Sequence, residues 1–197
     1  MGVTIGLRER KKLAAMRRIQ EVALDLFDER GFHAVSIEEI AQAADVSPSS
    51  VYRYFGTKEQ VVLHDEFDVT FIDAVEAELA SHPPIEAVRR ALGQLIAEFF
   101  GRDDELARRK VRYAYDEPSL RAATLKVTDG FVPLVADALA RASKREPDDL
   151  EVQVIASVLV WSLVTAVQHW HTTGYRAPLS EQLDTALDII DRGLLLD

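Results

Sequence analysis

Twelve residues from Ser47 to Lys58 (SPSSVYRYFGTK) bring together side chains suited to binding a polyanion. They include serine hydroxyls, two tyrosine rings, one arginine and one lysine. If Pro48 opens a helix, Val51 and Phe55 stand four residues apart and form its inward anchors. An outward arginine can donate two hydrogen bonds to O6 and N7 of guanine. The outward set on this helix is Ser49, Ser50, Arg53 and the ring of Tyr52 or Tyr54.

Lys58 gives a second indication of an anionic partner. It falls in the first turn of a predicted helix, where the helix dipole disfavours a cation unless an anion such as a phosphate lies there. The amino-terminal segment adds a basic arm, since residues 1–18 carry six basic side chains against Glu9 alone. The competing explanation is that three small helices merely form a mini-core. The arm, the lysine and the outward polar set together favour DNA contact over that explanation.

Enzymatic chemistry finds little support in the sequence. There is no cysteine, which excludes thiol catalysis and fits a reducing cytoplasm. His169 and His171 stand two residues apart, so on a helix they point in different directions and are poor co-ligands of a metal. We find no paired nucleophile and base and no glycine-rich phosphate loop. We therefore expect no enzyme, no metal site and no cofactor.

Three helix starts in this region carry capping signals. Ser36 is followed at the third position by Glu39, which is the reciprocal capping box. Ser47 is followed by proline at the first helical position, and Thr57 is followed at the third position by Gln60. Two short helices joined by a tight turn are typical of a helix-turn-helix, whose second helix enters the major groove of DNA.

The net charge of -10 is unevenly distributed along the chain. Residues 1–62 carry nine basic and nine acidic side chains, so the 14 basic and 24 acidic residues beyond them hold the whole deficit. A basic arm on a neutral amino-terminal part, attached to an acidic remainder, would allow only the amino-terminal part to approach a polyanion.

The rest of the chain also shows helical periodicity, which predicts an all-α fold of about nine helices. We expect a helix-turn-helix domain over residues 1–56 and a larger helical bundle over residues 57–197. A helix from Thr57 to about Ser81 would link the two, and Gly130 and Pro133 predict a kink or break in a later helix. The apolar run Val154 to Val167 is shorter than a membrane span, so we expect a buried helix, no membrane partner and a cytoplasmic protein.

The segment ERGFHAVSIEEIAQAADVSPSSVYRYFGTKEQVV closely resembles the amino-terminal DNA-binding domain of TetR-family transcriptional regulators. The resemblance spans about Arg10 to Leu63. It implies that Ser36, Tyr52, Tyr54 and Lys58 contact phosphates and that Ser49, Ser50 and Arg53 reach base edges, with Ser47 and Thr57 in the same DNA-binding set. The matching residues are Phe27, Gly31, Phe32, Ser36, Ile40, Ala41, Ala44, Val46, Ser47, Tyr52, Phe55 and Lys58.

For the acidic part, the resemblance implies a ligand-binding and dimerisation domain whose last two helices form a four-helix bundle with a second subunit. Two stripes suit that role, although they could equally be intramolecular core. The candidate dimer residues are Ile155, Leu159, Leu163, Leu183, Leu187, Ile190 and Leu194. Residues of mixed polarity and aromatic character are candidate pocket walls, with ordinary core as the alternative. They are Phe99, Tyr113, Tyr115, Phe131, Trp161, Thr165 and His169.

The resulting hypothesis is a dimeric transcriptional repressor that binds a near-palindromic DNA operator and releases it when a small-molecule effector binds. The helix from Thr57 would act as the lever between the two domains. A helical protein-interaction module that no longer binds DNA is the main alternative, and a regulator without a ligand or an activator would be a variation on the first hypothesis.

Overall fold

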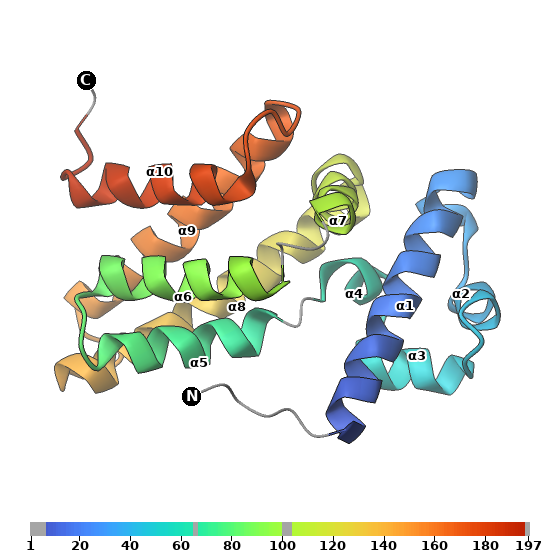
Figure 1. Cartoon of the computed structure of the whole chain (residues 1–197), viewed down its shortest axis with the longest axis horizontal. Coiled ribbons are helices and arrows are strands. Elements are labelled where there is room, and N and C mark those ends of the chain that lie inside the picture. Colours follow the sequence, from blue (N-terminus) through green and yellow to red (C-terminus); the bar gives the residue numbers. More distant parts are fainter. Residues whose placement is uncertain (1–6, 65–66, 100–103, 196–197) are drawn as a thin grey trace.

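The computed structural model describes residues 7–64, 67–99 and 104–195, with the side chains of residues 7–10, 67–69, 95–99 and 104 left out of the description. Within these ranges the chain forms ten α-helices, one 3-10 turn and no strand, which confirms the all-α prediction (Figure 1). The elements are α1 (Leu7–Arg30), η1 (Phe32–Ala34), α2 (Ile37–Ala43), α3 (Pro48–Phe55), α4 (Lys58–Leu63), α5 (Phe67–Leu79), α6 (Pro84–Phe99), α7 (Asp104–Asp116), α8 (Pro118–Ser143), α9 (Leu150–Thr172) and α10 (Leu179–Asp191).

Helices α1 to α4 form a small unit at one end of the molecule, which we call the head (Figure 1). Its core is apolar, and each helix contributes a side chain that is at most 1% exposed. The predicted anchors of α3 are both buried, which turns the polar residues of that helix outward. These four core side chains are Phe27, Ile40, Val51 and Val61.

Side-chain caps confirm the three predicted helix starts. Ser36 Oγ accepts a hydrogen bond from the Glu39 amide at 3.2 Å, and a Glu39 carboxylate oxygen accepts from the Ser36 amide at 2.8 Å. Ser47 Oγ accepts from the Ser50 amide at 3.2 Å, and Thr57 Oγ1 accepts from the Gln60 amide at 3.3 Å. Each cap satisfies an amide that the helix itself leaves without a partner.

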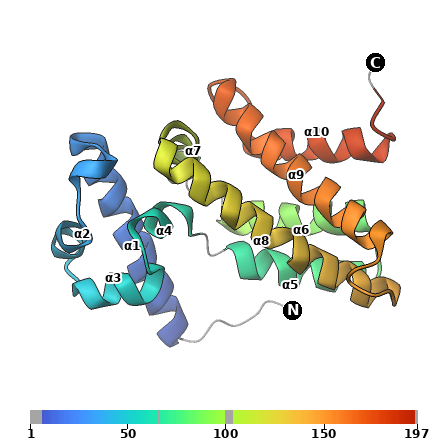
Figure 2. The ribbon, with the colours of Figure 1, turned by 180° about the vertical axis from the view of Figure 1, so that it is seen from behind.

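Helices α5 to α10 form the larger unit, which we call the body. Helices α5 and α6 lie side by side, and α9 packs extensively against both α8 and α10 (Figures 1 and 2). The main core of the body joins Val75, Val88, Leu139, Leu159 and Leu187. A smaller cluster surrounds Trp170, which is fully buried and donates a hydrogen bond from Nε1 to the Ala177 carbonyl at 2.8 Å.

The predicted continuous helix from Thr57 to about Ser81 is wrong, because α4 ends at Leu63 and His64 takes an extended conformation. Long-range bonds occupy the carbonyls at this end. Gln20 Nε2 donates to the carbonyls of Val61 (3.1 Å) and His64 (2.8 Å), and Lys110 Nζ donates to that of His64 (2.9 Å). Because the predicted single helix is divided into α4 and α5, the described ranges contain ten α-helices where we predicted about nine.

Two further helix predictions differ from the structure. Helix α8 continues through Gly130 and Pro133, so the chain does not break there and only the kink stays a prediction, and Phe131 and Val132 pack against the main core of the body. Helix α10 ends at Asp191, before Leu194, which we predict to lie on the helical stripe of candidate dimer residues. Gly193 and Leu194 both adopt positive φ angles of 85° and 60°, which close the helix and place Leu194 outside it.

The head and the body share packing at their junction. Leu120, in the first turn of α8, is fully buried within the core of the head, and Leu106 and Tyr113 of α7 pack against the same core. Helix α4 also belongs to this core through Val61 and Val62. Packing therefore continues across residue 56, and the domain boundary that we expect there stays a prediction.

Candidate nucleic-acid interface

The outward face of α3 presents a connected set of hydroxyl groups and one guanidinium. Ser47 Oγ lies 2.9 Å from both Ser49 Oγ and Ser50 Oγ. Arg53 Nη2 donates to Ser50 Oγ and to the Tyr54 hydroxyl, each at 3.3 Å, and its guanidinium carbon lies 4.9 Å from the centre of the Tyr54 ring. These contacts orient the arginine along the helix while leaving it at the surface, as a group that reads base edges requires.

Tyr52 stands beside this set and is 48% exposed. Its hydroxyl donates a hydrogen bond of 3.4 Å to Glu38 in the first turn of α2. Ser36, at the start of that helix, uses its hydroxyl in the capping box with Glu39. Hydrogen bonds from the Ser36 amide and hydroxyl and from Arg30 lower the pKa of Glu39 to about 2, so the Glu39 carboxylate of the capping box is ionised at neutral pH.

Lys58 has partners inside the head that the sequence did not predict. Its ammonium donates to the carbonyls of Phe32 (2.8 Å) and Val35 (2.9 Å) and lies 4.4 Å from the centre of the Phe32 ring. The side chain is half-buried and ties α4 to the turn between α1 and α2. A structural role thus accounts for this cation near a helix start, and its contact with a phosphate stays a prediction.

The candidate pocket walls whose side chains the structure describes lie in different surroundings. Tyr113 lies at the junction, where its hydroxyl donates to Asp28 at 2.8 Å. Tyr115 stacks on His171 with ring centres 5.7 Å apart, and Phe131 packs against the main core of the body. Trp161, Thr165 and His169 are exposed on the outer face of α9. The side chain of Phe99 lies outside the described part of the chain.

Most of the candidate dimer residues are buried or half-buried within the chain. Leu159, Leu183 and Leu187 are buried inside the chain, at 2%, 7% and 0% exposure, which corresponds to the alternative of intramolecular core. Ile155, Leu163 and Ile190 are half-buried against that core, and Leu194 lies beyond the last helix. On α9, the candidate dimer residue Leu159 therefore faces the core, whereas the candidate pocket residues Trp161, Thr165 and His169 face outward.

Sequence reasoning missed the apolar outer face of α9. Val154 and Trp161 are 51% and 38% exposed there, and Ile189 of α10 is 37% exposed. The sequence from Val152 to Gln168 carries no charged residue, which is the signal that could have identified this face. Within the described ranges α9 is also long and apolar enough to cross a membrane, but it packs between α8 and α10.

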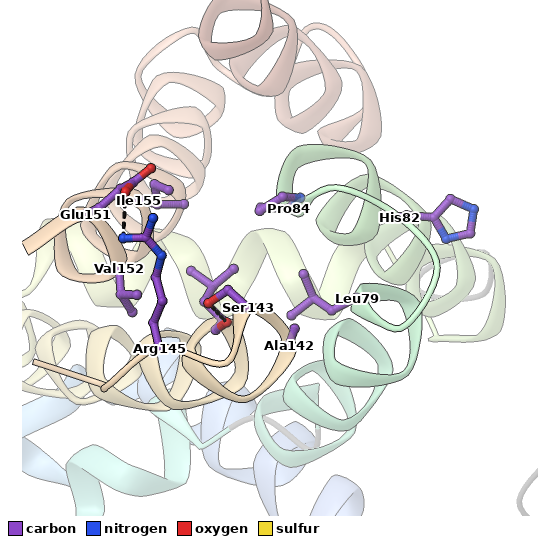
Figure 3. A pocket seen from close by; sticks show the side chains of 10 residues that line it. Leu79, His82, Pro84, Ala142, Ser143, Arg145, Glu151, Val152 and Ile155 are labelled. Atoms are coloured by element: carbon purple, nitrogen blue, oxygen red, sulfur yellow. Dashed lines mark hydrogen bonds and ion pairs between the residues drawn. The ribbon is translucent and has the colours of Figure 1, made fainter. Parts of the chain in front are cut away.

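Two hollows lie at the end of the body where the α5–α6 and α8–α9 connections meet. One, of about 330 Å³, has an apolar floor that includes Leu79, Leu139 and Val152, and an ion pair of 2.7 Å between Arg145 and Glu151 crosses its rim (Figure 3). The other, of about 520 Å³, lies between the start of α6 and the helices α9 and α10, beside the exposed Val154. Neither hollow includes a predicted aromatic wall.

Comparison with known families decides what kind of protein this is. Residues 19–64 match the family described as bacterial regulatory proteins, tetR family. Residues 82–195, more than half of the chain, match the MftR C-terminal domain of TetR-type regulators. The chain belongs to the TetR family. It is therefore a DNA-binding transcriptional regulator, and α2 and α3 are its helix-turn-helix.

Relatives within the TetR family are similar over nearly their whole length. A Mycobacterium tuberculosis protein, named as the mycofactocin biosynthesis transcriptional regulator MftR, is 27% identical over 188 residues, covering 94% of this chain and 93% of its own. The transcriptional regulator TcmR of Streptomyces glaucescens is 28% identical over 202 residues, covering 98% of this chain and 89% of its own.

Solved structures of TetR-family regulators share the fold. Thermus thermophilus FadR, a repressor solved with lauroyl-CoA, gives a TM-score of 0.54 at 23% identity and covers 92% of this chain and 96% of its own. SmeT, a repressor of a Stenotrophomonas maltophilia efflux pump solved with triclosan, gives a TM-score of 0.60 at 18% identity and covers 93% and 95%.

Proposed function

We propose that this regulator is a homodimeric repressor that binds a near-palindromic operator in the cytoplasm and releases it when a small molecule binds the body. The observation that carries the proposal is the outward face of α3, where Ser50 and Tyr54 orient Arg53 while Val51 and Phe55 anchor the helix. Only a face that is both exposed and fixed can discriminate between bases at low entropic cost.

The roles that we propose on DNA are those that the resemblance to the family implies, and the exposure of these groups on the head supports them. Ser49, Ser50 and Arg53 reach base edges, with guanine as the base that suits the arginine. Ser36, Ser47, Tyr52, Tyr54 and Thr57 set the head on phosphates through hydroxyl groups at or near three helix starts. Lys58 contributes positive charge close to the same surface, although its ammonium already has two carbonyl partners.

The outer face of α9 supports the proposed dimer. A second copy is the occupant that we assign to this face, because an uncharged, apolar surface of this kind is self-complementary under twofold symmetry. Val154, Trp161 and Ile189 provide its exposed apolar side chains. Two heads related by this axis would contact two half-sites about one DNA turn apart, which is why we expect a near-palindrome.

The effector is proposed to be a small apolar or amphipathic molecule. Two structural neighbours support this class, since FadR was solved with lauroyl-CoA and SmeT with triclosan. Both compounds serve as probes in a titration of the regulator on its operator. A fall in operator affinity with either probe supports the release mechanism. If a wider set of such compounds leaves the affinity unchanged, the effector proposal fails and a regulator without a ligand remains.

The DNA proposal is tested by selecting sites from a random duplex pool with the full chain and then measuring affinity against salt concentration. Specific binding should weaken steeply as salt rises, because each neutralised phosphate releases counterions. The enriched sequences should be near-palindromes. A pool without enrichment, together with a shallow salt dependence, would instead favour the protein-interaction module.

A further inference from the structure

The carboxylate of Asp28, near the end of α1, accepts hydrogen bonds from three side chains of α7. Asp28 Oδ2 accepts from Arg109 Nε at 3.0 Å and from Arg109 Nη2 at 2.7 Å. Asp28 Oδ1 accepts from the Tyr113 hydroxyl at 2.8 Å and from Arg112 Nη2. Arg109 Nη2 also lies 2.8 Å from Asp25. We call these five residues the Asp28 cluster, and its three α7 members share one helix face because they are three or four residues apart.

This cluster differs from an ordinary surface ion pair, which contributes little because water and salt screen it. Several donors converge on a single carboxylate, and the Arg109 side chain is only 18% exposed. Burial opposes ionisation of Asp28, but hydrogen bonds from Tyr113 and Arg109 and the charges of both arginines hold its pKa below the usual value. Burial and the bond to Asp28 raise the pKa of Tyr113 to about 12.

Helix α1 on its own would disfavour these acidic residues. Asp25 and Asp28 lie in its last two turns, where the helix dipole is negative and a carboxylate is repelled. The arginines of α7 supply the compensating charge from the body. Phe27 of α1 and Tyr113 of α7 add an edge-to-face ring contact, with centres 5.7 Å apart, on the apolar side of the same junction.

The last two residues of α7, Tyr115 and Asp116, contact α9. His171 Nε2 lies 2.8 Å from an Asp116 carboxylate oxygen, and the Tyr115 ring stacks on the His171 ring. His171 belongs to α9, the helix whose outer face we assign to the second copy. Helix α7 lies between α1 and α9 in both views (Figures 1 and 2). It thus connects the helix of the proposed dimer face to the first helix of the head.

We propose that Asp28 is a positioning residue, which fixes the head to α7 and thereby sets the separation between the two recognition helices of the dimer. The proposal rests on the proposed function, since only a dimer on two half-sites has such a separation. The junction contains no continuous helix between α4 and α5, so the orientation of the head depends on packing contacts, those of α7 among them, together with those of α8 through Leu120 and through the ion pair of Glu117 with His33.

The test compares Asp28→Asn with Glu29→Gln. Both variants remove one negative charge from an exposed residue at the end of α1, but Glu29 lies outside the cluster. Affinity is measured on selected operators whose half-sites are moved apart or together by one and two base pairs. For Asp28→Asn we expect the preference for the optimal spacing over its neighbours to fall about fivefold, with affinity for an isolated half-site unchanged. Glu29→Gln should keep the parental preference. Equal spacing profiles for the two variants would overturn the proposal.

A second measurement does not depend on DNA. The chain has no cysteine, so spin labels can be placed at Ala43→Cys in α2 and Ala77→Cys in α5, both exposed. Mixing with excess unlabelled protein restricts the signal to distances within one chain. We expect a broader distance distribution in Asp28→Asn than in Glu29→Gln. Identical distributions would refute the positioning role even if the protein bound no operator, whereas failure of the parent to bind DNA with the distance result intact would refute only the proposed function.

Discussion

In the head, the starts of α2, α3 and α4 are each closed by a hydroxyl three residues before the amide that it accepts from. In the body, α10 starts without a side-chain cap and is held instead by Arg89 of α6, which pairs with Asp184 at 2.9 Å and with Asp188 at 2.6 Å. The starts of α8 and α9 are also capped, by Glu117 and Asp149, so the contrast is between the helix-turn-helix, whose helix starts are all marked by neighbouring residues, and α10, which is held by a distant helix. Such local signals can be recognised in the sequence alone.

The same contrast holds for charge. Residues 1–62 are neutral overall, while the rest of the chain carries the whole net charge of -10. An acidic body repels DNA and directs the neutral head towards it, so the junction between the two units determines how the head is presented. The following predictions test that division of roles, from the largest expected effect to the smallest.

Leu120→Ala should cost about 2 to 5 kcal/mol of stability, because it empties a fully buried site where the body enters the core of the head. Urea unfolding followed by circular dichroism measures the loss. Hydrogen exchange should rise in α1 to α4 more than in α9 and α10. The control is Leu134→Ala on the same helix, where the side chain is 46% exposed. Equal losses for the two variants would contradict the shared core.

Trp161→Ala should weaken the dimer about 30-fold or more, as expected when a central interface tryptophan is truncated. Sedimentation equilibrium gives the dissociation constant. Leu125→Ala serves as the control, since that side chain is also exposed, at 53%, but belongs to α8. A dimer that tolerates the loss of Trp161 as well as it tolerates the loss of Leu125 would exclude this face as the contact.

Lys58→Met should cost about 1 to 3 kcal/mol, because the carbonyls of Phe32 and Val35 lose a charged donor while the aliphatic packing is kept. Thermal unfolding measures the change, with Lys126→Met on the exposed surface of α8 as the control. Unchanged stability would show that the ammonium does not stabilise the head, and would leave contact with a DNA phosphate as the role of Lys58.

The smallest effect concerns the capping box and pH. The pKa of Glu39 falls from 4.5 to about 2 in the folded head, so its contribution is present above about pH 4.5 and is lost as the pH falls towards 2. The stability difference between the parent and Glu39→Gln should therefore shrink over that range. Unfolding free energies measured from pH 6 to pH 2 test this, and a difference that does not change with pH would show that the carboxylate charge is irrelevant.

The sequence predicted the head well because its evidence is local. Caps at Ser36, Ser47 and Thr57 and the anchors Val51 and Phe55 follow from spacings of three or four residues. It did not indicate the carbonyl partners of Lys58, which lie 23 and 26 residues earlier in the chain. It was wrong after Leu63, where side chains 41 to 46 residues away occupy the carbonyls that a longer helix would use.

In the body, periodicity could not choose the inward face of α9. That helix is apolar on most sides, so the stripe through Leu159 and the stripe through Trp161 looked equally suitable for burial. Trp161 and Trp170 stand nine residues apart, about two and a half turns, and the structure exposes the first while burying the second. Only the packing of α8 and α10 against α9 distinguishes them.

The central claim is that α3 reads sequence through Arg53, and one measurement tests it most directly. Affinities of the parent and of Arg53→Ala are compared on the selected operator, on operators changed at single base pairs and on random duplex DNA, with the exposed Arg176→Ala of the body as the control. We predict that Arg53→Ala loses about 10-fold to 100-fold on the operator, loses discrimination at one symmetric position in each half-site, and binds random DNA nearly as the parent does. Equal losses on the operator and on random DNA, with every base preference retained, would contradict the claim.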